Sequence, residues 1–158
     1  MKQEEFEARI IAMQDVLYRV SATLLYQQCD REDAIQECIF KAIRKREKLR
    51  DDKAMQSWVI RILINECYAI LRRAKRVQPC ETLPEPKAAP DADKEVFRML
   101  FSLEEKIRLP MVLYYAEGYD TREIAIMLHI PGGTVRSRLA RGREKLRVMI
   151  QNEEAANV

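Results

Sequence analysis

Apolar residues recur at helical spacing along most of this chain. In the N-terminal half, one series comprises Phe6, Ile10, Met13, Leu17 and Val20. A second comprises Ile35, Ile39, Ala42 and Ile43, and a third comprises Trp58, Ile62, Leu63, Tyr68 and Leu71. Steps of three and four place each series along one stripe of a helix. The stripes must bury against each other, so residues 1–76 are predicted to form an antiparallel helical bundle, with turns at Gln27–Asp30 and Arg50–Lys53.

The second half has room for three to four short helices between residues 94 and 150, with breaks expected at Pro110, Gly118 and Pro131. The intervening stretch 77–93 holds four of the six prolines. Proline fixes φ and lacks a backbone donor, so this stretch reads as an extended acidic linker. The sequence therefore predicts an all-α chain of two small domains, 1–76 and 94–150, joined by a linker at 77–93 and followed by a tail at 151–158.

Composition supports a folded chain, and charge divides it into blocks. Of the 158 residues, 47% are hydrophobic, which is enough for a core, and the net charge is only +3. Residues 1–40 sum to −4, residues 41–76 to +8, residues 77–120 to −4 and residues 121–158 to +3. Two basic blocks separated by acidic ones suggest two separate surfaces for polyanions.

The strongest motif is GYDTREIAIMLHIPGGTVRSRLARGREKLR at residues 118–147. Asp120 and Glu123 have the spacing of a capping box, and Ile124, Met127 and Leu128 form a short apolar stripe. A second helix is expected to begin near Gly132–Thr134, with Val135, Leu139 and Leu146 facing inward. Its other face carries Arg136, Ser137, Arg138, Arg141, Arg143, Lys145 and Arg147.

Two short helices, a tight turn and a basic second helix are typical of a helix-turn-helix, whose second helix enters the major groove. A solvated surface helix would also be basic, but it would leave the caps and the turn unexplained. Gly133 would let the backbone approach a phosphate. His129 lies in the turn, where a residue at positive φ is expected, and no partner suggests a catalytic or metal-binding role for it.

Other chemistry is not indicated. The four cysteines are dispersed and His129 is the only histidine, so we expect reduced thiols and neither a metal nor a cofactor. No nucleophile–base set or phosphate-binding glycine loop is present, so the chain is not expected to be an enzyme. The acidic N-terminus has no apolar segment of a signal peptide, and no apolar run approaches the roughly 20 residues of a membrane span. The expected location is cytoplasmic.

Residues 118–147 resemble region 4.2 of bacterial sigma factors, in particular the extracytoplasmic-function (ECF) group. The resemblance rests on Arg122–Ala125, Ile130–Pro131 and Gly133–Leu146, and the run from Leu109 to Gly118 looks like region 4.1. In the first half, Asp33, Gln36 and Glu37 resemble region 2.2, while Trp58–Asn65 followed by Leu71–Arg76 resembles regions 2.3 and 2.4. The spacing between the two motif sets leaves no room for region 3, and the N-terminal arm is expected to be too short for region 1.1, as in the ECF group.

The resemblance implies a sigma factor that binds RNA polymerase core and recognises a two-part promoter. It implies polymerase contacts to the β′ coiled coil at Asp33, Gln36 and Glu37. Capture of the minus-10 strand is implied for Trp58, Arg61, Asn65, Arg72, Arg73, Lys75 and Arg76, with the loop Arg50–Met55. Minus-35 recognition is implied for Thr134, Arg136, Ser137, Arg138, Ala140 and Arg141. Further implied partners are the polymerase β flap and an anti-sigma factor.

For several of these residues a purely structural role remains an alternative to the role that the resemblance implies. Trp58 fits a core position as well as a stacking wedge. The acidic pair Asp33 and Glu37 is also what a solvated helix face carries. The family usually has an aromatic where Ile39 stands, whereas here Phe40 comes one place later. The alternative function is a stand-alone helix-turn-helix regulator, which the basic segment of the first half argues against.

Overall fold

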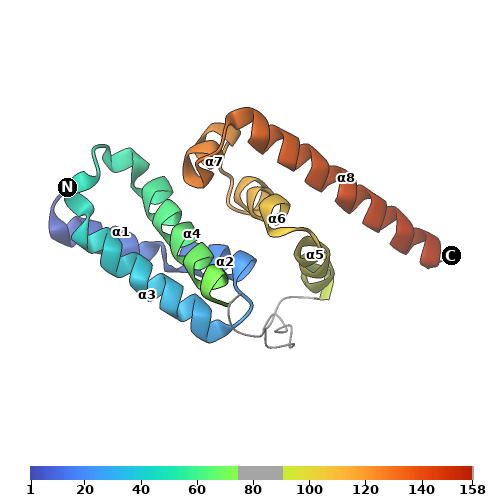
Figure 1. The fold of residues 1–158 in the computed structure, drawn as a ribbon, viewed down its shortest axis with the longest axis horizontal. Coiled ribbons are helices and arrows are strands. Elements are labelled where there is room, and N and C mark those ends of the chain that lie inside the picture. The colour runs from blue at the N-terminus through green and yellow to red at the C-terminus, as the bar shows by residue number, and fades with distance from the viewer. Residues whose placement is uncertain (75–90, 158) are drawn as a thin grey trace. The chain divides into compact units, whose positions relative to one another are not determined.

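The computed structural model describes residues 1–74 and 91–157, and every regular element in these ranges is helical (Figure 1). The α-helices are α1 (Gln3–Ala12), α2 (Gln14–Leu24), α3 (Gln28–Arg44), α4 (Met55–Ala74), α5 (Asp91–Ser102), α6 (Glu105–Met111), α7 (Thr121–Leu128) and α8 (Gly132–Ala156). Two 3₁₀ turns, η1 (Arg46–Lys48) and η2 (Asp52–Ala54), precede α4, and a π-helix, η3 (Val112–Ala116), follows α6. The all-α prediction is confirmed.

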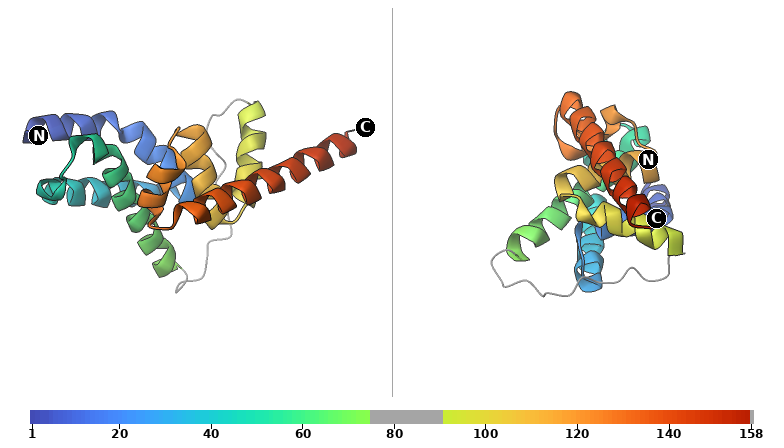
Figure 2. Two further views of the ribbon diagram at one scale, coloured as in Figure 1. Left: turned by 90° about the horizontal axis from the view of Figure 1, so that it is seen from above. Right: turned by 90° about the vertical axis from the view of Figure 1, so that its right-hand side faces the viewer.

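The helices divide between two compact units, the first made mainly by α1–α4 and the second mainly by α5–α8. Helix α5 begins at Asp91, so residues 91–93, expected in the linker, start a helix instead. The rest of the expected linker lies outside the described residues, as do Lys75 and Arg76. Residues 151–156, expected as a tail, continue α8, which Figure 2 shows as one long helix.

The first apolar series forms one buried stripe over two helices. Phe6, Ile10, Met13, Leu17 and Val20 are all buried, as their spacing predicts. The chain nevertheless breaks between α1 and α2 at Met13, whose N–H is shared between the carbonyls of Arg9 at 3.1 Å and Ile10 at 3.0 Å. The spacing does not reveal the break because the stripe continues across it.

The stripe predicted for α3 is displaced toward smaller residues. Of the predicted series only Ala42 is buried, together with Ala34 and Cys38, whereas Ile35, Ile39 and Ile43 are only half-buried. Helix α3 packs against α4 through this small-residue face, and the Cys38 thiol lies 3.5 Å from the carbonyl of Val59. Small side chains let two helices approach closely, since interaxial distance depends on the residues at the contact. A prediction that follows the large apolar residues therefore selects the neighbouring face.

The buried stripe of α4 also differs from the predicted one, but it consists mainly of large apolar residues. Its buried residues are Met55, Val59, Ile60, Leu63, Ile64 and Cys67. Of the predicted series only Leu63 is fully buried, and Trp58, Ile62, Tyr68 and Leu71 lie at the boundary of the core. Trp58 packs edge-on against Phe6 of α1, with ring centroids 6.4 Å apart. The core of the first unit is thus built from α1, α2 and the small-residue contact of α3 with α4.

In the second unit, a helix was expected to break at Pro110. This prediction is wrong, because Pro110 lies inside α6. All five residues from Ile107 to Met111 are buried, so packing outweighs the poor helix propensity of proline. The buried Arg108 donates to the carbonyls of Phe101 at 3.1 Å and Leu103 at 3.2 Å, and its guanidinium lies 4.6 Å from the Phe101 ring centroid. These contacts hold the end of α5 against α6.

Candidate nucleic-acid and protein interfaces

The two ends of α7, the helix that precedes α8, have the local features that the sequence predicts. The Glu123 N–H donates to Asp120 Oδ1 at 2.8 Å, and the Asp120 N–H donates to the Glu123 carboxylate at 2.9 Å. This is the predicted capping box. His129 has φ of 56°, as expected, and is the one described non-glycine residue in the left-handed region. It ends α7 and lets the chain turn into α8.

Helix α8 presents one apolar face and one polar face. Val135, Leu139 and Gly142 are buried, while Arg136, Ser137, Ala140 and Arg141 are exposed. Thr134 and Arg138 are half-buried at the border between the faces. The six residues predicted for minus-35 recognition therefore lie together on the first turns of α8. Arginine and serine side chains there could donate to base edges and phosphates.

Gly142 fixes how α8 crosses α6. A Cβ atom at this position would lie 2.7 Å from Met111 Sδ and 3.1 Å from Ile107 Cγ2. Only glycine lets the two helices meet without displacing these side chains. Gly142 was not among the residues predicted to be important. It nevertheless follows the buried Leu139 by three residues, which places it on the same inward face of α8.

The residues predicted for minus-10 capture do not all share one face. Asn65 follows Arg61 by four residues and Arg72 follows Asn65 by seven, so the three side chains follow one stripe of α4. Asn65 and Arg72 are exposed, whereas Trp58 and Arg61 are half-buried at the base of this stripe. Arg73 lies on a different face, beside Ile70 and Glu66. The adjoining loop is ordered by Asp51, whose side chain accepts from the Lys53 N–H at 3.0 Å.

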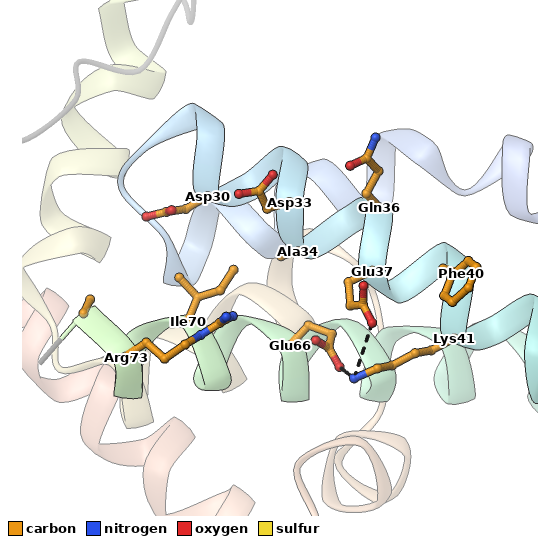
Figure 3. Close-up of a pocket in the computed structure, with 11 residues that line it drawn as sticks. Asp30, Asp33, Ala34, Gln36, Glu37, Phe40, Lys41, Glu66, Ile70 and Arg73 are labelled. Carbon is orange, nitrogen blue, oxygen red and sulfur yellow. Dashed lines mark hydrogen bonds and ion pairs between the residues drawn. The ribbon is translucent and has the colours of Figure 1, made fainter. Parts of the chain in front are cut away.

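A groove of about 1080 Å³ runs between α3 and α4. It is lined by Asp30, Asp33, Ala34, Gln36, Glu37, Phe40, Lys41, Glu66, Ile70, Arg73 and Ala74 (Figure 3). All three residues predicted for polymerase contact are among them. Phe40 is 56% exposed, so an apolar ring stands among the carboxylates. The groove combines acidic and apolar surface, which suits a basic amphipathic partner helix.

One cation in this groove is held by two carboxylates. The Lys41 ammonium contacts Glu66 closely and lies 3.8 Å from Glu37 Oε1 (Figure 3). The hydrogen bond to Glu66 raises the pKa of Lys41. Glu66 is thus the closer partner of Lys41, and Glu37 shares this cation at a longer distance, while no ion pair of Asp33 is found among the described residues. Sequence reasoning missed Glu66 and Lys41, although Glu66 is the one acidic residue between positions 53 and 80.

Two further properties concern membrane-spanning segments and the cysteine thiols. None of the helices in the described ranges combines the length and the apolarity that a bilayer crossing requires. Cys29, Cys38 and Cys67 are free thiols, of which only Cys29 is exposed.

The chain matches known proteins along both units. Residues 10–77 match the family model of Sigma-70 region 2, and residues 93–146 match that of Sigma-70, region 4. ECF RNA polymerase sigma factor SigM of Mycobacterium tuberculosis is 35% identical over 138 residues, covering 82% of this chain and 69% of that protein. ECF RNA polymerase sigma-E factor of Escherichia coli is 31% identical over 142 residues, covering 77% and 74%.

Two solved structures share the fold. The sigma factor RpoE of Bartonella quintana, in complex with the anti-sigma factor NepR, superposes with a TM-score of 0.79 at 22% identity, covering 94% of this chain and 98% of that one. CnrH, in complex with the cytosolic domain of CnrY, gives a TM-score of 0.72 at 21% identity, covering 96% and 90%. A stand-alone regulator would leave the match over residues 10–77 unexplained. With both regions matched in order, this chain belongs to the ECF group of RNA polymerase sigma factors, the non-catalytic proteins that bind polymerase core and direct promoter-specific initiation.

Proposed function

We propose that the exposed face of α8 reads the minus-35 element. The observation that carries this proposal is the division of α8, where Val135 and Leu139 are buried while Arg136, Ser137, Ala140 and Arg141 are exposed on the opposite side. A recognition helix contacts base edges with its first turns, and arginine is suited to guanine. Thr134 and Arg138, at the border of this face, are positioned for phosphates.

The first unit captures the minus-10 strand along α4. Arg61, Asn65 and Arg72 form a polar stripe with Trp58 at its base, and the sequence adds Lys75 and Arg76 beyond Ala74. Single-stranded DNA binds to such surfaces through positive charge along the backbone and through stacking on aromatic rings. The ordered loop before α4 would hold an extruded base, which needs hydrogen bonds in return for lost stacking. Arg73 faces the groove instead, which favours a role at the protein interface.

The groove between α3 and α4 binds the polymerase core. Asp33, Gln36 and Glu37 line it, and Glu66 keeps Lys41 occupied. Charge-assisted hydrogen bonds from a basic helix, such as the polymerase β′ coiled coil, would be strong here. The second unit then engages the β flap beside the minus-35 element.

Regulation by an anti-sigma factor is part of the proposal. RpoE and CnrH, which share this fold, were both solved with protein partners, NepR and the cytosolic domain of CnrY. We infer a comparable partner for this chain and a cytoplasmic location, where polymerase and promoter DNA are found.

The assignment of α8 is tested with Arg136→Ala and Arg141→Ala in holoenzyme assembled from this chain and purified core polymerase. Each substitution should weaken binding to the matching minus-35 base pair by about 1–3 kcal/mol. Base-pair substitutions across the element locate the contact, since a variant loses preference only at the position it reads. Arg147→Ala serves as the matched control, because Arg147 is already paired with Glu144 at 2.6 Å. Equal loss of core binding in the two test variants would reject the assignment.

A further inference from the structure

Two exposed tyrosines stand on the π-helix η3, next to α8. Tyr114 is 38% exposed and Tyr115 is 55% exposed, and their rings meet edge to face with centroids 4.9 Å apart. The turn is closed by the Glu117 N–H, which donates to the Val112 carbonyl at 3.1 Å. Single-turn π-helices often occur at functional sites. Because both rings are exposed, core packing alone does not explain why two tyrosines occupy this turn.

Tyr115 holds Arg143 of α8 without neutralising it. The Arg143 Nη1 group donates to the Tyr115 hydroxyl at 3.2 Å. This partner is a hydroxyl and not a carboxylate, so no anion balances the positive charge of the guanidinium here. Among the described residues Arg143 has no carboxylate partner, in contrast to Arg147, which pairs with Glu144 at 2.6 Å. One of the five guanidinium donors is used, and the others remain available to a ligand.

The position of Arg143 places this charge at the far end of the proposed reading face. Arg143 follows Arg136 by seven residues and Ala140 by three, so all three lie on one side of α8. Seven residues correspond to about 10 Å along a helix axis. The major groove is about 12 Å wide. If Arg136 faces the bases, Arg143 therefore reaches the sugar–phosphate backbone at the groove wall.

We propose that Arg143 and Tyr115 form a phosphate-binding pair that fixes the register of α8 on the minus-35 duplex. This inference rests on the proposed minus-35 function of α8. Arg143 contacts the phosphate, and Tyr115 is a positioning residue that orients the guanidinium. Phosphate contacts fix orientation and carry no sequence information, so the pair sets affinity and leaves base preference to the first turns of α8.

The test measures binding of holoenzyme, built with the full chain, to promoter fragments over a range of salt concentrations. Arg143→Ala should lower the slope of log K against log salt by about 0.9, because one phosphate contact releases its counterion. It should weaken binding equally on matched and mismatched minus-35 sequences. Tyr115→Phe removes only the hydroxyl and keeps the ring, so it should weaken binding about two- to fivefold through a less ordered guanidinium. Arg147→Ala is the control and should leave the slope unchanged.

The possible outcomes separate this inference from the function on which it rests. If wild-type holoenzyme shows no minus-35 preference, the proposed function fails and this inference fails with it. If the preference is present but Arg143→Ala has the wild-type slope, only the phosphate pair is rejected. A selective loss of preference at one base pair in Arg143→Ala would also reject it, since that result identifies a base contact. Unfolding curves of each variant establish that the fold is retained.

Discussion

At the scale of single residues, the partner of each arginine decides what that arginine can do. Arg108 is buried and donates to the backbone carbonyls of Phe101 and Leu103, which makes it part of the packing of the second unit. Arg147 is paired with Glu144 on the surface. Arg143 is oriented by an uncharged phenol. Three arginines of one unit thus differ in available charge, which a count of basic residues does not show.

The three described cysteines should differ sharply in reactivity. Burial raises the pKa of the Cys38 and Cys67 thiols to about 12, while Cys29 is exposed. Because the thiolate is the reactive form, iodoacetamide at pH 8 should label Cys29 in the folded protein and leave the two buried thiols unmodified. Peptide mass analysis of Cys80→Ser protein measures this directly. Labelling of Cys38 or Cys67 at the rate of Cys29 would contradict the packing of α3 on α4.

The same burial predicts a loss of stability in alkaline solution. In the unfolded chain the thiols titrate near their ordinary pKa of 9.0, whereas in the folded protein they stay protonated to about 12. The folded state therefore binds more protons above pH 9, so the contribution of these thiols is complete below pH 9 and is lost as pH rises toward 12. Chemical unfolding at pH 8 and pH 10 should show the decline, and Cys67→Ala should reduce it.

At this scale, contacts that are local in sequence were predictable and distant contacts were not. The capping box of Asp120 and Glu123 and the positive φ of His129 depend on neighbours within a few residues, and both predictions are confirmed. The ion pair of Lys41 with Glu66 joins positions 25 apart on two helices. Nothing in helical spacing indicates that these two side chains meet.

At the scale of elements, the spacing of apolar residues predicted where helices form. Which face of each helix is buried was decided by packing against the other helices. The stripe of α3 was predicted from Ile35, Ile39, Ala42 and Ile43, of which only Ala42 is buried, and the contact with α4 also uses Ala34 and Cys38. Pro110 was expected to end a helix and lies within α6. In both cases a tertiary contact outweighed the local preference, and that contact becomes visible only when the partner helix is in place.

The capping box of α7 should make a measurable contribution to stability. Asp120→Ala removes the acceptor for the Glu123 N–H and should lower the free energy of unfolding by about 1 kcal/mol. Asp120→Asn keeps an oxygen acceptor at the same place and is the matched control. Thermal unfolding followed by circular dichroism compares the two variants. Equal stability of the Ala and Asn variants would show that the cap contributes nothing.

The contact of α8 with α6 should not tolerate a side chain at Gly142. Gly142→Val places methyl groups against Met111 and Ile107, and overpacking of this kind costs about 1–3 kcal/mol. The control is Ala140→Val, which introduces the same residue at an exposed position of the same helix. Urea unfolding should show a clearly larger loss for Gly142→Val. A loss no greater than that of the control would contradict the close approach of the two helices.

At the scale of the whole molecule, the residues proposed for the two promoter elements lie in different compact units. The described residues proposed for the minus-10 element belong to α4 of the first unit, and those proposed for the minus-35 element belong to α8 of the second. Two linked modules gain affinity when both sites are present on one DNA, even if each module binds weakly alone. The alternating charge blocks of the sequence follow this division, with +8 over residues 41–76 and +3 over residues 121–158.

The central claim is that this chain directs polymerase core to promoters through both units. Run-off transcription with purified core polymerase, this chain and a library of genomic fragments tests it most directly. The account predicts products that require the chain and disappear when either the minus-10 or the minus-35 element of an active fragment is scrambled. Absence of any chain-dependent product across the library would contradict the account, as would products that survive the loss of both elements.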